Sequence, residues 1–544
     1  SHTAAVADAL RELGYEVAAG NYFDTLQVKA EAAVVQDSAL ARNINFFYPD
    51  ESTVRMSFDE VTTADEVAQV VAVFAEAAGK KAPKSVKVDE GKVAIDGALL
   101  RTDKILDAPV FDKYHSETEM MRYIKRLERR DISLADSMIP LGSCTMKLNA
   151  AVEMMPLSLA EFTNIHPFAP ASQTEGYLEM IRELEHDLAA ITGFAGCSLQ
   201  PESGASGEYT GLMTIRAYHQ SRGQGYRTTI LIPASAHGTN PASAAMAGMK
   251  IVIVNSDEHG NIDVEDFKAK AAANAAELCG AMITYPSTHG VFESKIRELV
   301  DAVHDAGGLV FMDGANMNAQ VGLTNPGYIG ADVCHLNLHK TFATPHGGGG
   351  PGAGAVGCKD FLIPYLPHSA LAEEPGHIQV RSFMGNFLVV VRALTYLLTL
   401  GRQGIPEAAQ NAVLNANYLQ EKLRGTFQPA YDRICMHEFV LDLSGLKKET
   451  GVSALDVAKS LIDEGIHPPT MYFPLIVHEA LMLEPTETEG PETLDHAAEV
   501  LRKLYHKAFE DAESMHTAPH HMPIGRPDDC LLYTSPSPRD LSTS

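Results

Sequence analysis

Cysteine, positive charge and long uninterrupted apolar runs are all scarce in this 544-residue sequence. Its seven cysteines are scattered and form no CxxC pair, which argues against structural zinc and favours a reducing compartment. Lysines and arginines number 43 against 70 aspartates and glutamates, which gives a formal net charge of −27. Because nucleic acids and anionic membranes bind basic surfaces, we expect neither of them as a partner.

The most apolar stretch covers residues 386–401, is short for a membrane span and is interrupted by Arg392. We therefore predict a buried helix there. The N-terminus shows no basic segment followed by an apolar one, so we expect no signal peptide. The share of hydrophobic residues, 45%, and of charged residues, 21%, is ordinary for a soluble globular protein with several structural units.

Between about residues 141 and 360, short apolar runs alternate with helical patterns. The apolar runs predict strands at 229–234, 250–254, 281–285, 308–312 and 333–338. Residues 294–306 have apolar side chains at helical spacing and end at two glycines. This alternation predicts an α/β fold with a largely parallel sheet, in which ligands bind at the carboxyl ends of the strands.

We divide the sequence into a small N-terminal domain, a connector, a large α/β domain, a small C-terminal domain and a tail. Their predicted bounds are 1–85, 86–140, 141–385, 386–529 and 530–544. Residues 9–26 and 458–475 resemble each other weakly, which indicates either two related small domains or a chance match of a common αβ unit. The tail is rich in serine and proline without periodicity, and we interpret it as non-native.

Two segments near the predicted strands have the residue types of a cofactor site. Ser203, Gly204 and Ala205 precede the helical run 208–220, and small residues there let backbone N–H groups approach a phosphate. His237 follows the strand at 229–234 and offers a flat ring for stacking. The ordinary alternatives are a glycine-containing helix entry and a loop histidine.

Three further strand ends carry polar residues. Asp313 ends one strand, where its carboxylate would keep a pyridine nitrogen protonated, and Ala315 is small enough to lie against the ring. A helix N-cap is the alternative for Asp313. Thr288, beside Ser287, is placed to donate to a ring hydroxyl. Lys340 ends the strand at 333–338 beside a glycine-rich loop, where a partly desolvated amine suits imine chemistry.

Together these residues supply the five groups that pyridoxal 5′-phosphate (PLP) requires: a phosphate cradle, a stacking group, a carboxylate, a hydroxyl donor and a lysine. Other motifs are weaker. Gly352–Gly357 matches GxGxxG but lacks the preceding strand of a dinucleotide fold. The pairs His335–His339 and His520–His521 lack the HExxH context, so we expect no metal site.

Several blocks resemble the P-protein family of the glycine cleavage system. The most specific is HLNLHKTFATPHGGGGPGAGAVG (335–357), which is similar to the family's PLP-lysine signature. The other blocks are SMIPLGSCTMKLN (137–149), NIHPFAP (164–170), QPESGASGEYTGL (200–212), ASAHGTNPASA (234–244), TYPSTHGVFE (284–293), GHIQVRSFMGNFL (376–388) and HPPTMYFPLIVHEALMLEPTETE (467–489). The resemblance covers nearly everything from residue 1 to about 529.

The resemblance implies a PLP-dependent transferase fold of type I, like aspartate aminotransferase, with a large mixed or parallel sheet domain and a small α+β domain. It implies that Lys340 forms a Schiff base with PLP and that Asp313 and His237 are the other catalytic residues. The implied reaction is that of glycine dehydrogenase (aminomethyl-transferring, decarboxylating): glycine loses CO2, and its aminomethyl group passes to the lipoyl disulfide of H-protein. Ser143–Thr145 lie in a block that the family places near the active site, and binding of the substrate carboxylate is a hypothesis for them.

Two departures from the family matter. Residues 1–85 resemble the end of the family's first half and the rest resembles its catalytic second half, so the expected partner is the remaining first half or an equivalent subunit, in a dimer or heterotetramer. Glu202 and Ser206 stand where we expect Asn and Gln. The alternatives are another type-I PLP enzyme acting on a small amino acid, such as a hydroxymethyltransferase or transaminase, and a truncated non-catalytic subunit. We expect a location in the bacterial cytoplasm, with the mitochondrion as the alternative.

Overall fold

The computed structural model describes residues 1–346, 352–367 and 378–528. It divides into two compact units, Ser1–Glu119 and Met120–Ser544, and the boundary falls inside the predicted connector. The predicted tail at 530–544 lies outside the described residues, as does most of the glycine-rich loop after Lys340.

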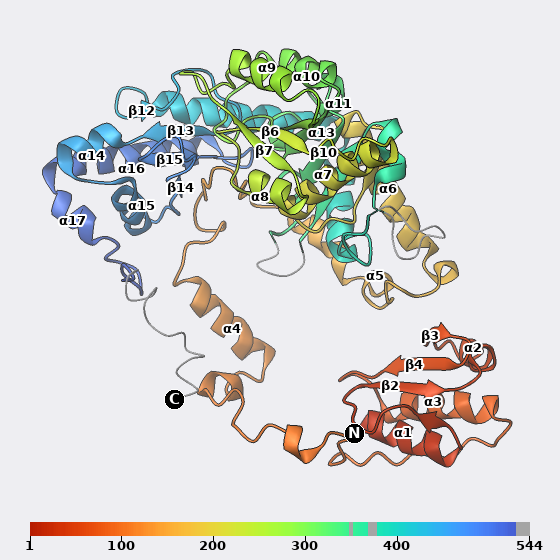
Figure 1. The fold of residues 1–544 in the computed structure, drawn as a ribbon. Helices are drawn as coiled ribbons and strands as arrows, with labels where there is room; N and C mark the ends of the chain where they lie inside the picture. The colour runs from red at the N-terminus through yellow and green to blue at the C-terminus, as the bar shows by residue number, and fades with distance from the viewer. Residues whose placement is uncertain (347–351, 368–377, 529–544) are drawn as a thin grey trace. The chain divides into compact units, whose positions relative to one another are not determined.

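The first unit is a four-stranded antiparallel sheet with strand order β1-β2-β4-β3, packed against helices (Figure 1). Its elements are α1 (His2–Glu12), β1 (Glu16–Val17), β2 (Thr25–Lys29), α2 (Ala32–Leu40), β3 (Phe47–Asp50), β4 (Thr53–Ser57) and α3 (Ala64–Ala77), with short 3-10 turns at Gly97–Leu99 and Pro109–Asp112. Alternate residues of β2, Leu26 and Val28, are buried with Phe74 of α3 in one core. Thr63 and Glu66 form a capping box at the start of α3, which fixes where that helix begins.

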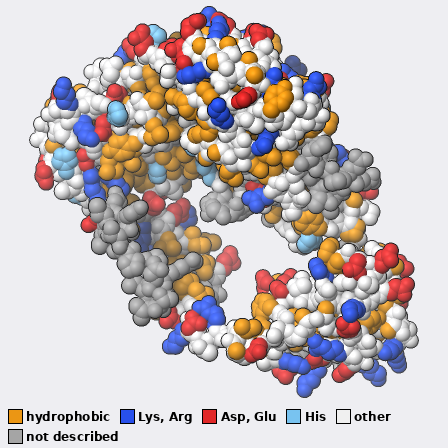
Figure 2. Space-filling model, viewed as in Figure 1, with side chains coloured by type: hydrophobic (Ala, Val, Ile, Leu, Met, Phe, Trp, Pro, Cys, Tyr) orange, Lys and Arg blue, Asp and Glu red, His pale blue; other side chains and the backbone are white. Residues whose placement is uncertain are grey.

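Helix α4 (Glu117–Glu128) follows, and none of its residues is buried. Met120, Met121, Ile124 and Leu127 lie at helical spacing and are each more than 40% exposed. Figure 2 shows these apolar side chains gathered on the surface of the helix. Helix α4 is thus amphipathic, with its apolar stripe exposed.

The second unit contains a seven-stranded mixed sheet with strand order β5-β11-β10-β9-β8-β6-β7. Strands β6 to β10 run parallel, and β11 runs antiparallel to both β10 and β5. The strands are β5 (Gly196–Ser198), β6 (Thr229–Pro233), β7 (Lys250–Val254), β8 (Leu278–Thr284), β9 (Leu309–Gly314), β10 (Val333–Asn337) and β11 (Gly354–Cys358). The five predicted strands are therefore confirmed. The segment that matched GxGxxG contributes most of strand β11 and not a nucleotide loop.

Helices cover both faces of this sheet (Figure 1). They are α5 (Ala160–Thr163), α6 (Glu175–Thr192), α7 (Gly204–Ser221), α8 (Thr239–Met246), α9 (Val264–Ala273), α10 (Ile296–Asp305), α11 (Pro326–Ile329) and α12 (Leu338–Thr341), with 3-10 turns at Ala151–Ser158, Ala171–Gln173, Met317–Ala319 and Asp360–Tyr365. Alternate strand residues enter two different cores: Val310 and Met312 pack with α6 and α10, whereas Phe311 packs with α7. Strands buried on both faces need continuous apolar runs, which is why the sequence pattern identified them.

The chain then enters the small C-terminal domain through α13 (Phe387–Leu423), which is long and apolar enough to cross a membrane by length and composition alone. Its first part, including Val390 and Leu394, belongs to the core of the large sheet, and its last part, including Ala416 and Leu419, to the core of the small domain. At Gly401 the backbone leaves helical geometry and the helix bends. The predicted buried helix at 386–401 is confirmed.

The small domain has a second four-stranded antiparallel sheet with strand order β12-β13-β15-β14. Its elements after α13 are β12 (Gln428–Pro429), β13 (Phe439–Asp442), α14 (Ser444–Thr450), α15 (Ala454–Asp463), β14 (Thr470–Met471), β15 (Ala480–Leu483), α16 (Pro491–Glu510) and α17 (Ala512–Thr517). Helix α15 leads into edge strand β14, which pairs antiparallel with β15. Helix α1 leads into β1 and β2 in the same way, which agrees with the interpretation of two related small domains.

Candidate active site

The polar residues that follow the parallel strands come together at the carboxyl ends of those strands in the seven-stranded sheet. Lys340 lies in the single turn of α12, directly after β10, and is only 7% exposed. Asp313 is at the end of the neighbouring strand β9, and the register places it beside His335 of β10. The Lys340 ammonium is close enough to contribute to the electrostatics of both side chains.

Asp313 is a buried carboxylate held by several donors. Its Oδ2 accepts hydrogen bonds from the Asn240 amide at 3.0 Å and from the Thr284 hydroxyl at 3.3 Å, and its Oδ1 accepts one from the Ala315 N–H at 3.0 Å. Burial raises the pKa of Asp313, but His335, the Asn240 amide and Ala315 N–H outweigh it and hold the pKa below its usual value. The carboxylate is thus charged and fixed at the carboxyl end of β9.

His335 lies beside Asp313 on the neighbouring strand β10. Its Nε2 lies 3.5 Å from Asp313 Oδ1, and its ring stacks on Phe311 with centroids 5.7 Å apart. Burial lowers the pKa of His335, so the ring is neutral near pH 7. From the sequence, His335 was considered only as one of two histidines of a rejected metal pair. In the structure it lies beside the Asp313 carboxylate.

His237 lies half-buried in the loop after β6. Its Nδ1 accepts a hydrogen bond from the Thr239 N–H at 3.2 Å, and its ring meets that of Phe473, from the small domain, at 5.3 Å. Burial lowers the pKa of His237, which favours the neutral ring that stacking requires. Thr239 in turn donates to Glu208 of α7 at 2.7 Å, so this loop is fixed against that helix.

The predicted phosphate cradle is the N-terminus of α7, which begins at Gly204. Ser203 caps the helix by accepting a hydrogen bond from the Ser206 N–H at 3.1 Å. The Ser206 hydroxyl is buried and has no hydrogen-bond partner among the described residues. A Cβ at Gly204 would lie 2.6 Å from the Asn337 amide oxygen, so a larger residue there would require the Asn337 side chain to move. Ala205 is exposed at the same helix end.

The positions of Thr288 and Ala315, two other predicted site residues, give weaker support to their predicted roles. The Thr288 hydroxyl is buried and donates to the carbonyl of Ser235 at 2.8 Å, so its proton is already used. Ala315 is half-buried beside Asp313. Glu202, a departure from the family pattern, forms an ion pair of 2.9 Å with Arg381.

The block around Ser143 folds against the same site under backbone strain. Ser143 and Thr145 have φ values of 65° and 44°, and Ala343, three residues after Lys340, has a φ of 60°. Left-handed conformations cost non-glycine residues energy and concentrate at functional sites. Two buried glutamates, Glu438 and Glu484, hold this block through backbone hydrogen bonds. Sequence reasoning missed both, although Glu438 directly precedes one apolar strand and Glu484 directly follows another.

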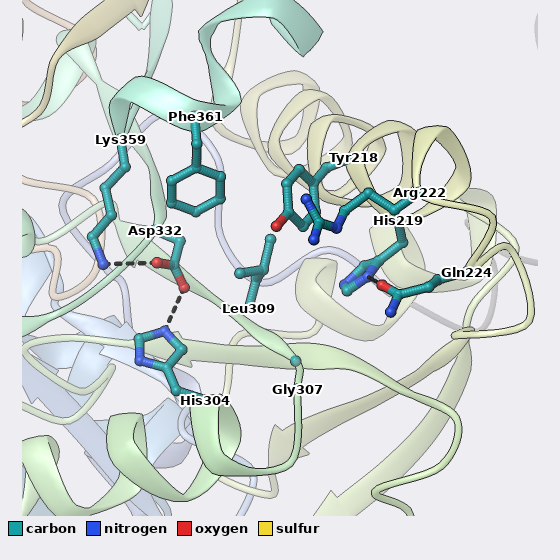
Figure 3. Close-up of a pocket in the computed structure, with 11 residues that line it drawn as sticks. Tyr218, His219, Arg222, Gln224, His304, Gly307, Leu309, Asp332, Lys359 and Phe361 are labelled. Atoms are coloured by element: carbon teal, nitrogen blue, oxygen red, sulfur yellow. Dashed lines mark hydrogen bonds and ion pairs between the residues drawn. The ribbon is translucent and has the colours of Figure 1, made fainter.

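A hollow of about 430 Å³ lies at the amino ends of strands β9 and β10, opposite the carboxyl ends (Figure 3). Asp332, which precedes β10, lines it and accepts hydrogen bonds from His304, Lys359 and the Val310 N–H at 2.6, 2.7 and 2.8 Å. The carboxylate therefore ties β9 to α10 and β11. None of the residues predicted to bind the cofactor lines this hollow, so we assign Asp332 a structural role.

Comparison with known proteins decides the family. A sequence model described as the glycine cleavage system P-protein matches residues 1–74 and 80–369, which is more than half of the chain. The chain belongs to this P-protein family. A second model, described as the glycine dehydrogenase C-terminal domain, matches residues 408–523.

Curated relatives of the P-protein chain are named glycine dehydrogenase (decarboxylating). The protein from Christiangramia forsetii is 49% identical over 533 residues, which cover 95% of this chain and 56% of the relative. The protein from Flavobacterium johnsoniae is 50% identical over 535 residues, with the same coverage of 95% and 56%. The chain thus spans about half the length of the curated relatives it matches.

Solved structures agree on the fold. The chain is similar to an inhibitor-bound glycine decarboxylase (P-protein), with a TM-score of 0.61, 18% identity and coverage of 82% of this chain and 100% of the other. It is also similar to a cysteine desulfurase from Thermococcus onnurineus, with a TM-score of 0.55, 15% identity and coverage of 70% and 98%. The predicted type-I fold of PLP enzymes is confirmed.

The family implies PLP as the cofactor, and the residues present fit it. The N-terminus of α7 presents its first backbone N–H groups to a phosphate, and the Ser206 hydroxyl has no hydrogen-bond partner in the described part of the chain. Asp313 is a charged, buried carboxylate suited to a protonated pyridine nitrogen. Lys340 is the buried amine at the same carboxyl end of the parallel strands.

Proposed function

We propose that this chain carries the centre that decarboxylates glycine and transfers the remaining aminomethyl group to the lipoyl disulfide of H-protein. One observation supports the proposal most strongly. Lys340, Asp313 and the N-terminus of α7 all lie at the carboxyl ends of the parallel strands, in a chain of the P-protein family. Similarity at about 50% identity to glycine dehydrogenases (decarboxylating) supports the choice of glycine.

Bound PLP would supply the electron sink that accepts the electron pair left when the carboxylate departs as CO2. The protein's part is to hold that sink in place. The α7 N-terminus would bind the phosphate, and Asp313 would hold a proton on the ring nitrogen. His237 would stack on the ring, and Lys340 would provide the amine that holds the cofactor until the substrate amine replaces it.

The buried surroundings of Lys340 favour this chemistry. Its neighbours include His335, His437 and Cys144, each of which lies within electrostatic reach of its ammonium. Burial lowers the pKa of His437 to about 3, so that ring stays neutral. Lys340 therefore lies in a buried site whose histidines His335 and His437 are uncharged.

Lipoylated H-protein and the rest of the family's length complete the proposal as partners. Because the chain spans about half of its relatives, we expect full activity from a protein that includes the remaining half. A non-catalytic subunit would have no reason to retain Lys340 and Asp313 together with a helix N-terminus suited to a phosphate.

The test is release of CO2 from carboxyl-labelled glycine in the presence of lipoylated H-protein, measured for this chain alone and extended to the length of its relatives. Lys340→Ala is the inactive control. Dependence of CO2 release on both Lys340 and H-protein supports the proposal. Transamination of glycine without loss of its carboxyl group would replace it with the rival PLP chemistry.

A further inference from the structure

Two glutamates of the small domain lie side by side, and Lys340 acts electrostatically on both. Glu438 immediately precedes β13, and Glu484 immediately follows β15. The register pairs Phe439 with Leu483, so the two glutamates occupy the next cross-strand position. One ligand-type atom each of Glu438, Glu484 and His437 lies within 4.8 Å of the others.

The group is fully buried and poor in cations. Glu438, Glu484 and His437 have no measurable exposure. Among the described residues, neither glutamate has a lysine or arginine within ion-pair distance, although the Lys340 ammonium acts on both. Two carboxylates cannot both stay ionised at this separation in a buried site, so the pair keeps a proton at neutral pH.

The hydrogen bonds show which glutamate carries that proton. Glu484 accepts three: from the Thr145 N–H at 3.1 Å, the Thr145 hydroxyl at 2.5 Å and the Asn318 amide at 2.9 Å. Glu438 accepts one on Oε2, from the Ser143 N–H at 2.5 Å, and its Oε1 has no hydrogen-bond partner in the described parts of the chain. Donors favour the ionised form, so Glu484, whose pKa burial raises to about 7, ionises before Glu438, whose pKa is raised well above its usual value, and Glu438 keeps the proton.

The other groups around Glu438 leave it in this state. Burial raises its pKa well above the usual value, with Glu484 acting in the same direction. His437 Nε2 lies 3.3 Å from the free Oε1, and its ring is neutral because burial lowers its pKa. The thiols of Cys144 and Cys435 face the same space with pKa values raised by burial, so neither supplies a charge.

The proposed reaction consumes one proton at this place. When the aminomethyl carbon bonds to one lipoyl sulfur, the S–S bond breaks, and its electron pair leaves on the second sulfur as a thiolate. The C–S bond takes the electron pair released by loss of CO2, and the thiolate then needs a proton. We propose that Glu438 is the acid that delivers this proton to the leaving lipoyl sulfur, with Glu484 as the fixed anion beside it. Glu438 is then left ionised, and because it is fully buried it regains a proton from solvent only when product release admits water to the site. This inference rests on the proposed function.

The test compares Glu438→Gln with Glu479→Gln in the protein extended to the length of its relatives. Glu479 is another buried glutamate of the small domain, and it binds the Ala454 N–H at 2.9 Å, away from the site. Glu438→Gln should slow aminomethyl transfer to lipoyl H-protein by about 100-fold, the usual effect of removing a general acid. Its Lys340 absorption band with PLP should be unchanged. Glu479→Gln should transfer at the wild-type rate.

The pH profile separates proton donation from mere support of the loop. In the wild type the transfer rate should fall as pH rises and Glu438 loses its proton, and Glu438→Gln should lack this fall. Glu438→Asp keeps the acid and should retain the fall at a reduced rate. Added acetate should restore part of the rate to Glu438→Ala.

The inference is overturned if Glu438→Gln transfers at the wild-type rate with an unchanged pH profile. It is also overturned if EDTA abolishes transfer and added Zn²⁺ restores it, because His437, Glu438 and Glu484 would then hold a metal. If the wild type releases no CO2 from glycine with H-protein, the proposed function fails and this inference fails with it.

Discussion

The ammonium of Lys147 donates a hydrogen bond of 3.0 Å to the backbone carbonyl of Thr341, the residue after Lys340. Lys147 is buried and forms an ion pair of 2.8 Å with Glu487 of the small domain. One cation thus fixes the turn that carries Lys340 and joins the strained block at Ser143 to the segment after β15.

Lys147→Met removes this cation and leaves Glu487 buried without its partner. We expect a loss of about 3–5 kcal/mol in the free energy of unfolding, measured by urea denaturation. The double variant Lys147→Met/Glu487→Met should recover part of this loss, since it leaves no unpaired charge. A double variant less stable than the single one would show that the ion pair does not govern the effect.

Asp313→Asn should fold and still bind PLP, but CO2 release from glycine should fall by about 100-fold or more, because the ring nitrogen loses its anion. Asp332→Asn is the matched control, a buried aspartate at the opposite end of the neighbouring strand (Figure 3). It should lower the melting temperature and leave the activity per folded molecule unchanged. Equal activity losses in the two variants would contradict the assignment of Asp313.

Ser203→Ala tests the phosphate cradle against another helix cap. Ser203 caps α7 and Ser453 caps α15, each by accepting a backbone N–H three residues on. Both alanine variants should lose about 1 kcal/mol of stability. Only Ser203→Ala should also weaken PLP binding, by about tenfold, measured by fluorescence titration. Unchanged PLP affinity would place the phosphate elsewhere.

Glu185 of α6 gives a pH dependence of stability. Burial raises its pKa to about 7, from a usual value of 4.5, and its Oε1 accepts the Leu199 N–H at 3.3 Å. Between these pH values the folded state holds a proton that the unfolded state has lost, so the free energy of unfolding falls as pH rises and levels off above 7.

Glu185→Gln is neutral at every pH and keeps an acceptor for Leu199. Relative to this variant, the wild type should lose about 1–3 kcal/mol of stability between pH 5 and pH 7.5. Other buried glutamates contribute equally to both proteins. Parallel stability curves from urea denaturation at the two pH values would contradict the raised pKa.

The sequence predicted the parallel strands because each is a continuous apolar run, and most of them, such as residues 229–233, are buried on both faces. It did not predict β5, which has three residues, or β11, whose glycine-rich run imitates a nucleotide motif. Short or glycine-rich strands gain their stability from neighbours and leave a weak pattern in the sequence.

Some residues of the candidate site were likewise predictable from the sequence, and others were not. Lys340 and Asp313 were predictable, since each follows its strand directly and local order fixes its position. Glu438 and Glu484 were not, because their hydrogen bonds reach residues 295 and 339 positions away in the chain. Contacts of that range depend on how the small domain packs against the large one, which no local pattern encodes.

The most direct test of the account is the visible absorption spectrum of the purified chain with added PLP, before and after borohydride, for the wild type and Lys340→Ala. The account predicts a Schiff-base band in the wild type that borohydride removes and that Lys340→Ala lacks. A band that persists in folded Lys340→Ala would contradict the assignment of Lys340. A folded wild type with no band, both alone and extended to the length of its relatives, would contradict the central claim itself.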